Sequence, residues 1–210
     1  QLHRFLNCIG GYTRSKFTYS FAAAEAMVPH ILGSYRAYLD TCTSWDSIEE
    51  NTELFVCFGG VPLKNGQIAQ GGTGSHNQKE KLISSAKAGI KFVNLSPLKS
   101  DLLDEVKGKW LPLRPNTDVA IMLGLAHTLY KENLYSEIFI KKYTEGFDIF
   151  LPYLLGDLDG VVKDANWASE ISEISSDEII SLARDMSSKR TMISVSWSLT
   201  RQDHGEQPFW

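Results

Sequence analysis

The sequence predicts an α/β fold with a mainly parallel sheet and flanking helices, in a Rossmann-like arrangement. Three short apolar segments have the length and composition of buried strands, and helical segments separate them along the chain. Because strands that alternate with helices build parallel sheets through crossover connections, this order favours the α/β class. The 210 residues are 43% hydrophobic, which supports one sizeable core, or one large and one partial core.

The predicted strands are apolar runs that end at a turn signal. Residues 54–60 (LFVCFGG) close with two glycines, and residues 90–95 (IKFVNL) stop before a Ser-Pro pair. Residues 191–197 (TMISVSW) are rich in β-branched and aromatic residues, which favour strands. A weaker fourth candidate lies near residues 110–113. Such runs are typical of strands in a parallel sheet that is covered on both faces.

Helical segments lie between these strands. Residues 21–32 favour a helix that Pro29 should end or kink. Residues 79–88 lead into Gly89, which suits a helix C-terminus, and complete a βαβ unit between the first two strands.

The clearest helix follows an Asn-Thr-Asp segment. We expect Asn116 or Thr117 to cap it, and Asp118 suits the positive end of its dipole. A further helix begins near Ser175, and Glu178 is spaced for a capping box.

Composition and charge exclude several classes of protein. The 21 basic and 25 acidic residues give a net charge of -4, without the basic patch that nucleic-acid binding requires. No apolar run is long enough to cross a bilayer. The three cysteines have no metal-binding or redox spacing. The first residues lack a signal-peptide pattern, so the sequence leaves the compartment, periplasmic or cytoplasmic, open.

The glycine-rich segments do not form an ordinary nucleotide motif. The first predicted strand ends in Gly59-Gly60, and a phosphate often binds beyond the carboxyl end of such a strand, but no GxGxxG pattern is present. The second strand ends at Ser96 without the acidic residue that holds a ribose in NAD sites, which disfavours NAD. Residues 71–75 (GGTGS) lack the Lys-Ser/Thr ending of a P-loop and indicate a surface loop.

Two polar segments are the better candidates for ligand contacts. Asp118 either serves its helix end alone or accepts hydrogen bonds from the two adjacent donors of guanine, which a carboxylate suits. Ser198 and Arg201 follow the third strand, where α/β sheets bind ligands, and Arg201 can hold a phosphate. His204 and Glu206 lie just beyond, but no nucleophile accompanies them, and a supporting role is the simpler interpretation.

Several segments together resemble a known family. They include RPNTDVAIMLG at 114–124, AHTL at 126–129, YTEGFD at 143–148, FLPYLLG at 150–156 and HGEQ at 204–207. The combination is similar to the molybdopterin-dependent oxidoreductases of the dimethyl sulfoxide reductase family. It is most similar to the branch that reduces trimethylamine N-oxide (TMAO), dimethyl sulfoxide (DMSO) and biotin sulfoxide, and it covers essentially the whole chain.

The resemblance implies that the chain is an internal part of a larger multidomain bacterial enzyme. The cofactor would be molybdenum bis(molybdopterin guanine dinucleotide), and the reaction would be oxygen atom transfer from an N-oxide or S-oxide. A cytochrome, or a reduced nicotinamide or thioredoxin system, would donate electrons. Residues 1–50 would be a partial helical segment of a neighbouring domain, and residues 51–210 all or part of the dinucleotide-binding domain.

Ten cofactor-binding residues follow from the resemblance, with no catalytic or metal-binding residue in this chain. Lys64 and Asn65 would lie near the phosphates, Leu95 and Ser96 near the guanosine ribose, Asn116, Thr117 and Asp118 at the guanine, and Trp197, Ser198 and Arg201 along the pterin or diphosphate. The serine that ligates molybdenum in this branch precedes the point that matches Gln1, so the chain alone should show no turnover.

Three positions depart from the family pattern. Val61 stands where the family commonly has Asp or Asn, Ser96 where it commonly has an acidic residue, and Asp203 where a second histidine is frequent. Two other functions remain open at this point. One is a stand-alone, non-catalytic nucleotide-binding module, which a natural start and stop at the ends of this chain would favour. The weaker one is an NAD-dependent enzyme, which nicotinamide dinucleotide binding would support.

Overall fold

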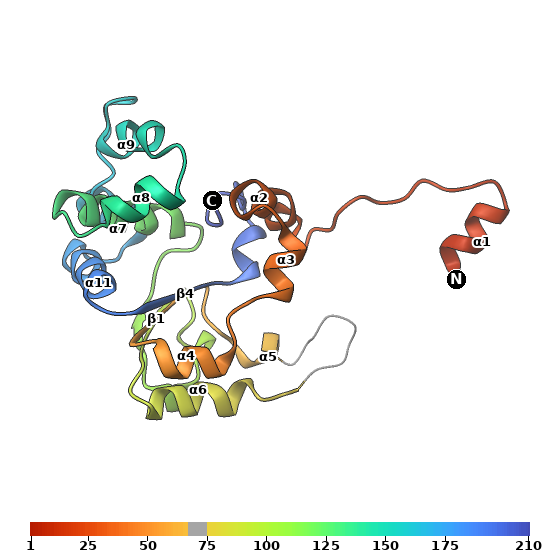
Figure 1. Cartoon of the computed structure of the whole chain (residues 1–210), viewed down its shortest axis with the longest axis horizontal. Coiled ribbons are helices and arrows are strands. Elements are labelled where there is room, and N and C mark those ends of the chain that lie inside the picture. Colours follow the sequence, from red (N-terminus) through yellow and green to blue (C-terminus); the bar gives the residue numbers. More distant parts are fainter. Residues whose placement is uncertain (67–74) are drawn as a thin grey trace.

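The computed structural model contains a four-stranded, all-parallel sheet with helices on both faces, as the sequence predicts (Figure 1). It describes residues 1–66 and 75–210, so residues 71–74 of the predicted glycine-rich loop lie outside the described part. The strand order is β3-β2-β1-β4. The strands are β1 (Leu54–Phe58), β2 (Lys91–Leu95), β3 (Lys109–Leu111) and β4 (Thr191–Val195).

Strands β1 and β4 are both shorter than the predicted ranges 54–60 and 191–197. β1 stops before Gly59 and Gly60, whose positive φ angles of 77° and 71° turn the chain out of the sheet. β4 stops at Val195, so the prediction that the strand reaches Trp197 is wrong. Ser196 accepts a hydrogen bond from the Ser198 backbone N–H and starts a 3₁₀ helix instead.

Helices cover the two faces of the sheet in separate groups (Figure 1). On one face lie α4 (Trp45–Asn51), α5 (Leu63–Gly66) and α6 (Gln78–Lys87), with the 3₁₀ helices η2 (Lys99–Asp101) and η3 (Asp104–Val106). On the other lie α7 (Asp118–Lys131), α8 (Glu137–Tyr143), α9 (Phe147–Leu155), α10 (Ala165–Ser172) and α11 (Ser176–Ser188). The last 3₁₀ helix, η4 (Trp197–Thr200), follows β4.

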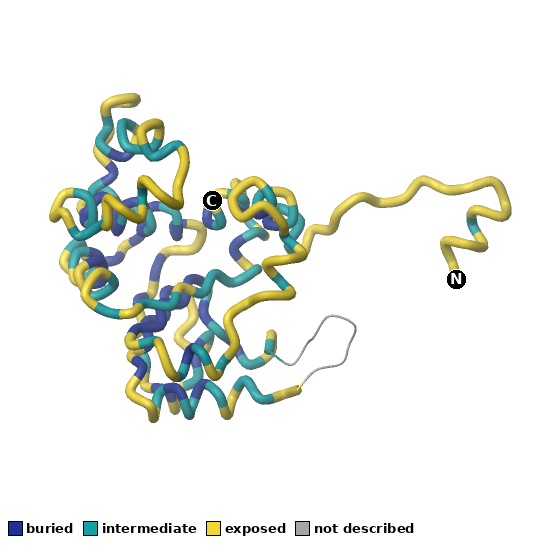
Figure 2. Tube along the Cα trace, viewed as in Figure 1, coloured by how far each residue is buried: buried dark blue, intermediate teal, exposed yellow. Residues whose placement is uncertain are grey.

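The alternation of side chains along β1 divides the core into two clusters. Val56 points into the cluster beneath α7, α10 and α11, whereas Phe55 and Cys57 point into the cluster beneath α4 and α6. All five residues of β1 are buried, because β1 lies between β2 and β4 (Figure 2).

The order of the strands creates a topological switch point between β1 and β4. From β1 the chain moves outward to β2 and β3, and then crosses back through α7–α11 to pair β4 with the other side of β1. In open α/β sheets, ligands bind outside the carboxyl ends of the strands at such a point.

The N-terminal part contains three helices that precede this body. α1 (Leu2–Cys8) and the exposed segment after it extend away from the rest of the chain (Figures 1 and 2). α2 (Ala22–Leu32) continues past Pro29 to Leu32, so Pro29 does not end it. α3 (Tyr35–Asp40) follows. The division between residues 50 and 51 stays a prediction, and α4 runs across it.

The predicted helix ends are only partly confirmed. Neither Asn116 nor Thr117 caps α7 with its side chain, because the Thr117 hydroxyl donates to the Arg114 carbonyl at 2.5 Å. Ser175 caps α11 by accepting from the Glu178 backbone N–H, but the Glu178 carboxylate pairs with Lys109 rather than closing a capping box.

Candidate functional site

The carboxyl ends of the strands meet at one edge of the sheet. Phe58 of β1 is in register with Leu95 of β2 and Val195 of β4. The Gly59 N–H donates to the Leu95 carbonyl at 2.9 Å, and the Ser196 N–H donates to the Phe58 carbonyl at 2.9 Å. The residues that follow β1, β2 and β4 therefore start from the same level, as a cofactor cradle requires.

Gly59 allows η4 to approach the end of β1 closely. A Cβ atom at this position would lie 2.4 Å from Leu199 Cδ1 and 2.8 Å from Ser196 Cβ. Ser198 Oγ would be 3.2 Å away from it. Only a glycine fits here, and it brings Ser198 to the switch point beside β1.

Asp118 is the buried acidic group of this region. It begins the 14-residue helix α7, and only 5% of the residue is exposed to solvent. Burial raises the pKa of Asp118 to about 6. Within residues 1–66 and 75–210, its own backbone N–H is the one donor that stabilises the charged form. A buried carboxylate with so few donors is suited to a ligand that brings N–H groups.

The other residues predicted for the guanine and phosphate contacts are exposed, except for Thr117. Asn116 is exposed and has a left-handed φ of 64°. Thr117 is buried, and its hydroxyl donates to the Arg114 carbonyl. Lys64 and Asn65 belong to α5, directly after β1, and both are exposed. Their side chains are accessible to an anion at the strand ends.

The predicted ribose residues are already engaged within the protein. The Leu95 side chain is fully buried in the core, so only its backbone can face a ligand. The Ser96 hydroxyl donates to Asp101 Oδ2 at 2.6 Å, and the Trp110 indole N–H donates to the Ser96 carbonyl at 2.8 Å. The acidic group that the sequence lacks at position 96 is thus brought to the same strand end by Asp101.

Trp197 and Arg201 connect η4 to the N-terminal helices. The Trp197 ring stacks on Phe209 with centroids 5.6 Å apart and lies 5.5 Å from the Phe21 ring. Arg201 Nε donates to the Ser20 carbonyl at 2.8 Å, and its side chain is exposed. Ser198 is exposed as well, and its hydroxyl donates to Ser196 Oγ at 2.9 Å.

His204 and Glu206 form no catalytic pair with a nucleophile among the described residues. His204 Nδ1 lies 3.6 Å from Glu206 Oε1, and the His204 side chain is 76% exposed. The turn that contains them packs on η4, since a Cβ at Gly205 would lie 2.3 Å from the Thr200 carbonyl oxygen. The supporting role expected for His204 and Glu206 stays a prediction.

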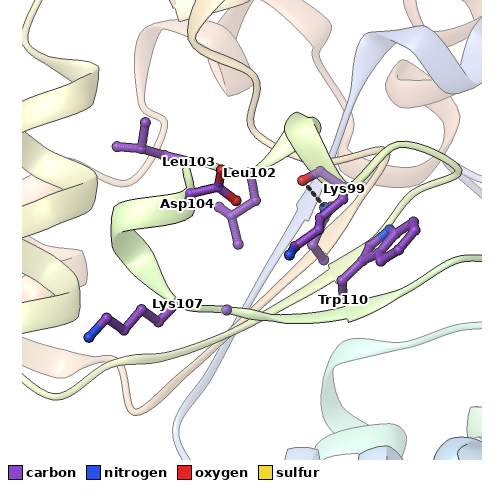
Figure 3. A pocket seen from close by; sticks show the side chains of 8 residues that line it. Lys99, Leu102, Leu103, Asp104, Lys107 and Trp110 are labelled. Atoms are coloured by element: carbon purple, nitrogen blue, oxygen red, sulfur yellow. Dashed lines mark hydrogen bonds between the residues drawn. The ribbon is translucent and has the colours of Figure 1, made fainter.

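A separate cavity of about 400 Å³ lies beside the strand ends, between β2, β3 and the η2–η3 segment (Figure 3). Lys99 and Trp110 line it, and the Lys107 side chain points away from Trp110. The Asn94 amide nitrogen donates to the Leu98 and Lys99 carbonyls, both at 3.4 Å. None of the ten predicted residues lines this cavity.

Comparison with known proteins identifies the family. The profile of the molybdopterin oxidoreductase family matches residues 1–210, and the chain therefore belongs to this family. It is 42% identical over 209 residues to the biotin sulfoxide reductase of Cereibacter sphaeroides. It is 40% identical over 209 residues to the dimethyl sulfoxide/trimethylamine N-oxide reductase of Rhodobacter capsulatus. It covers 28% and 25% of these two relatives, and they cover all of it.

Further comparisons agree with the fold and the branch. The chain is 38% identical over 211 residues to the trimethylamine-N-oxide reductase of Haemophilus influenzae, of which it covers 25%. Acetylene hydratase from Pelobacter acetylenicus has the same fold, with a TM-score of 0.69 and 22% identity over 99% of this chain and 25% of that one. The family and the α/β class predicted from the sequence are confirmed, and the chain spans about a quarter of these relatives.

Proposed function

We propose that this chain forms part of the cradle of a molybdenum bis(molybdopterin guanine dinucleotide) cofactor in an enzyme that reduces N-oxides or S-oxides. Relatives named for TMAO, DMSO and biotin sulfoxide support this substrate class, and a cytochrome, or a reduced nicotinamide or thioredoxin system, would be the electron donor. When bound, the cofactor supplies the redox chemistry of oxygen atom transfer. The residues of this chain bind and orient it.

The buried carboxylate of Asp118 carries the proposal. Guanine presents two adjacent N–H donors, and a carboxylate accepts both in the same geometry in which it accepts an arginine. Binding would restore the hydrogen bonds that burial withholds from Asp118, whose pKa of about 6 reflects that lack. An adenine would offer its ring acceptor to the same carboxylate and be rejected.

The phosphates and the pterin would extend from this anchor along the strand ends. Lys64 and Asn65 are exposed after β1, and Ser198 is exposed after β4, with Gly59 between the two segments. Arg201 and Trp197 would bound the site on the side of the N-terminal helices, and Asn116 and Thr117 would flank the guanine. Each of these segments follows a strand or begins a helix, which is where phosphate and nucleotide sites commonly lie in α/β folds.

The test is the cofactor content of the longest form of the protein that its gene encodes. We expect the purified protein to contain molybdenum and to release guanine nucleotide on acid treatment, in the ratio of the bis-dinucleotide form. Asp118→Asn places a donor against the guanine N–H groups. Since a hydrogen bond to a charged group contributes about 1.5–3 kcal/mol, guanine affinity should fall roughly tenfold or more.

Asp177→Asn is the matched control, because Asp177 is an exposed carboxylate in the first turn of α11. Its cofactor content should equal that of the unaltered protein. A protein purified from a host that makes the cofactor, yet without molybdenum or pterin, would contradict the proposed function.

A further inference from the structure

The Asp101 carboxylate lies at the end of β2, although Asp101 is several positions further along the chain. Asp101 lies in η2, five positions after Ser96, and the chain folds back so that Ser96 Oγ donates to Asp101 Oδ2 at 2.6 Å. In dinucleotide sites of α/β proteins, an acidic side chain near the end of the second strand of the βαβ unit accepts the ribose hydroxyls. β1, α6 and β2 form such a unit here.

Several contacts fix Asp101 between the ends of β1 and β2. The Asp101 carbonyl accepts from the Val61 N–H at 2.7 Å, and the Asp101 N–H donates to the Leu98 carbonyl at 3.2 Å. Gly60 makes this approach possible, since a Cβ there would lie 2.5 Å from the Asp101 Cβ. Asp101 is therefore held by both strand ends and is preorganised for a ligand that crosses them.

The hydrogen bonds of Ser96 assign different tasks to the two side chains. The one proton of the Ser96 hydroxyl is donated to Asp101, and its oxygen accepts from the Leu98 N–H at 3.3 Å. Within residues 1–66 and 75–210, Ser96 is the one residue that donates to the Asp101 carboxylate. The second oxygen, Oδ1, retains its acceptor capacity, and Asp101 is half-buried rather than enclosed.

We propose that Asp101 is the ribose-binding residue of this site, accepting the 2′- and 3′-hydroxyl protons of the guanosine, and that Ser96 is a positioning residue that orients its carboxylate. The inference rests on the proposed function and deepens it. The cavity of Figure 3 is not part of this site, because Asp101 is not among its lining residues. The contacts of Asp101 are instead with Ser96 and Val61 at the strand ends.

The experiment uses the longest form of the protein that its gene encodes, produced without cofactor in a host that cannot make molybdopterin. Guanosine 5′-monophosphate and 2′,3′-dideoxyguanosine 5′-monophosphate are titrated into it by calorimetry. We expect the unaltered protein to bind the ribonucleotide at least about tenfold more tightly, because hydrogen bonds to a charged acceptor are lost with the two hydroxyls.

Asp101→Asn should reduce this preference to about threefold or less, since a neutral amide oxygen is a weaker acceptor than a carboxylate oxygen. Ser96→Ala keeps the carboxylate but frees it, and should give an intermediate preference. Asp104→Asn changes a nearby exposed carboxylate and should keep the full preference.

The outcomes separate the two proposals. If the unaltered protein binds both nucleotides equally, or if Asp101→Asn keeps the full preference, Asp101 is not the ribose acceptor, and the guanine site stands. If the unaltered protein binds neither nucleotide and also lacks cofactor when made in a competent host, the proposed function fails and this inference fails with it. Equal binding in the unaltered protein is decisive even if Asp101→Asn does not fold.

Discussion

Asp118, a residue of the proposed site, shows how the burial of one carboxylate lowers the stability of the folded protein. A carboxylate that is buried with few donors is destabilised in its charged form, and this raises its pKa to about 6. A ligand that donates N–H groups to the carboxylate would offset this loss of stability. Asp118 is thus a side chain whose stability effect and proposed function have the same physical origin.

The first prediction concerns the pH dependence of stability in the cofactor-free protein. The pKa of Asp118 rises from the ordinary value of 3.8 to about 6 on folding. The folded state therefore binds the proton more tightly, and the stabilising contribution is complete below about pH 4 and lost as the pH rises through 6. Asp118→Asn does not titrate, so its stability relative to the unaltered protein should increase by up to about 3 kcal/mol from pH 4 to pH 8.

Urea denaturation of both proteins at several pH values measures this difference in the free energy of unfolding. Asp177→Asn, on the surface of α11, should follow the unaltered protein at every pH. Parallel curves for Asp118→Asn and the unaltered protein would show that the Asp118 carboxyl is not perturbed by burial.

At the scale of secondary-structure elements, a glycine of α7 allows this helix to pack closely on α10. Gly124 lies inside α7, where glycine ordinarily lowers helix stability by about 1 kcal/mol relative to alanine. A Cβ at Gly124 would lie 2.8 Å from the Ala168 Cβ of α10 and 3.4 Å from Ile179 Cγ2 of α11. The contact between helices therefore explains why a residue with low helix propensity occupies this position.

We expect Gly124→Ala to destabilise the protein by about 1–2 kcal/mol, because the clash outweighs the gain in helix propensity. Ala168→Gly removes the opposing methyl group. The double variant should therefore be more stable than the sum of the two single changes predicts, by roughly 1 kcal/mol or more. Denaturant unfolding of the four proteins measures the coupling, and strict additivity would contradict the proposed contact.

At the scale of the whole molecule, an aromatic cluster connects the N-terminal helices to the C-terminal end of the chain. Phe21 and Tyr35, from the N-terminal segment, contact Trp197 with centroid distances of 5.5 and 5.9 Å, and Phe209 stacks on Trp197 at 5.6 Å. The cluster and the Ser20–Arg201 hydrogen bond fasten α2 to η4. The strand-end loop after β4 is therefore held by residues far away in the sequence.

Phe21→Ala should loosen this connection without unfolding the sheet. Aromatic pairs contribute about 0.5–1.5 kcal/mol beyond the area they bury, so local opening should become roughly tenfold more frequent or more. Hydrogen exchange should accelerate in α2 and η4 but not in α6. Phe139→Ala, on the exposed surface of α8, is the control and should leave exchange in all three elements unchanged. Unchanged exchange in α2 and η4 after Phe21→Ala would contradict the connection.

The sequence by itself determined the features that depend on local composition. Apolar runs marked β1 and β2, because a strand covered on both faces is apolar along most of its length. β4 was marked by its β-branched and aromatic residues, and β3, in which only Leu111 is buried, was marked by a weaker run. The Asn-Thr-Asp segment marked the start of α7 and drew attention to Asp118. The motifs around it identified the family, which periodicity alone does not do.

Only the tertiary structure decided which side chains meet at the site. Thr117 and Glu178 have the spacing of caps, but each finds a different partner, Arg114 and Lys109. Asp101 reaches the end of β2 because the chain turns back after Ser96 and because Gly60 leaves room for it. The sequence pattern at the end of β2 pointed only to Ser96. Such contacts depend on the packing of residues distant in the chain, and local propensity does not encode that packing.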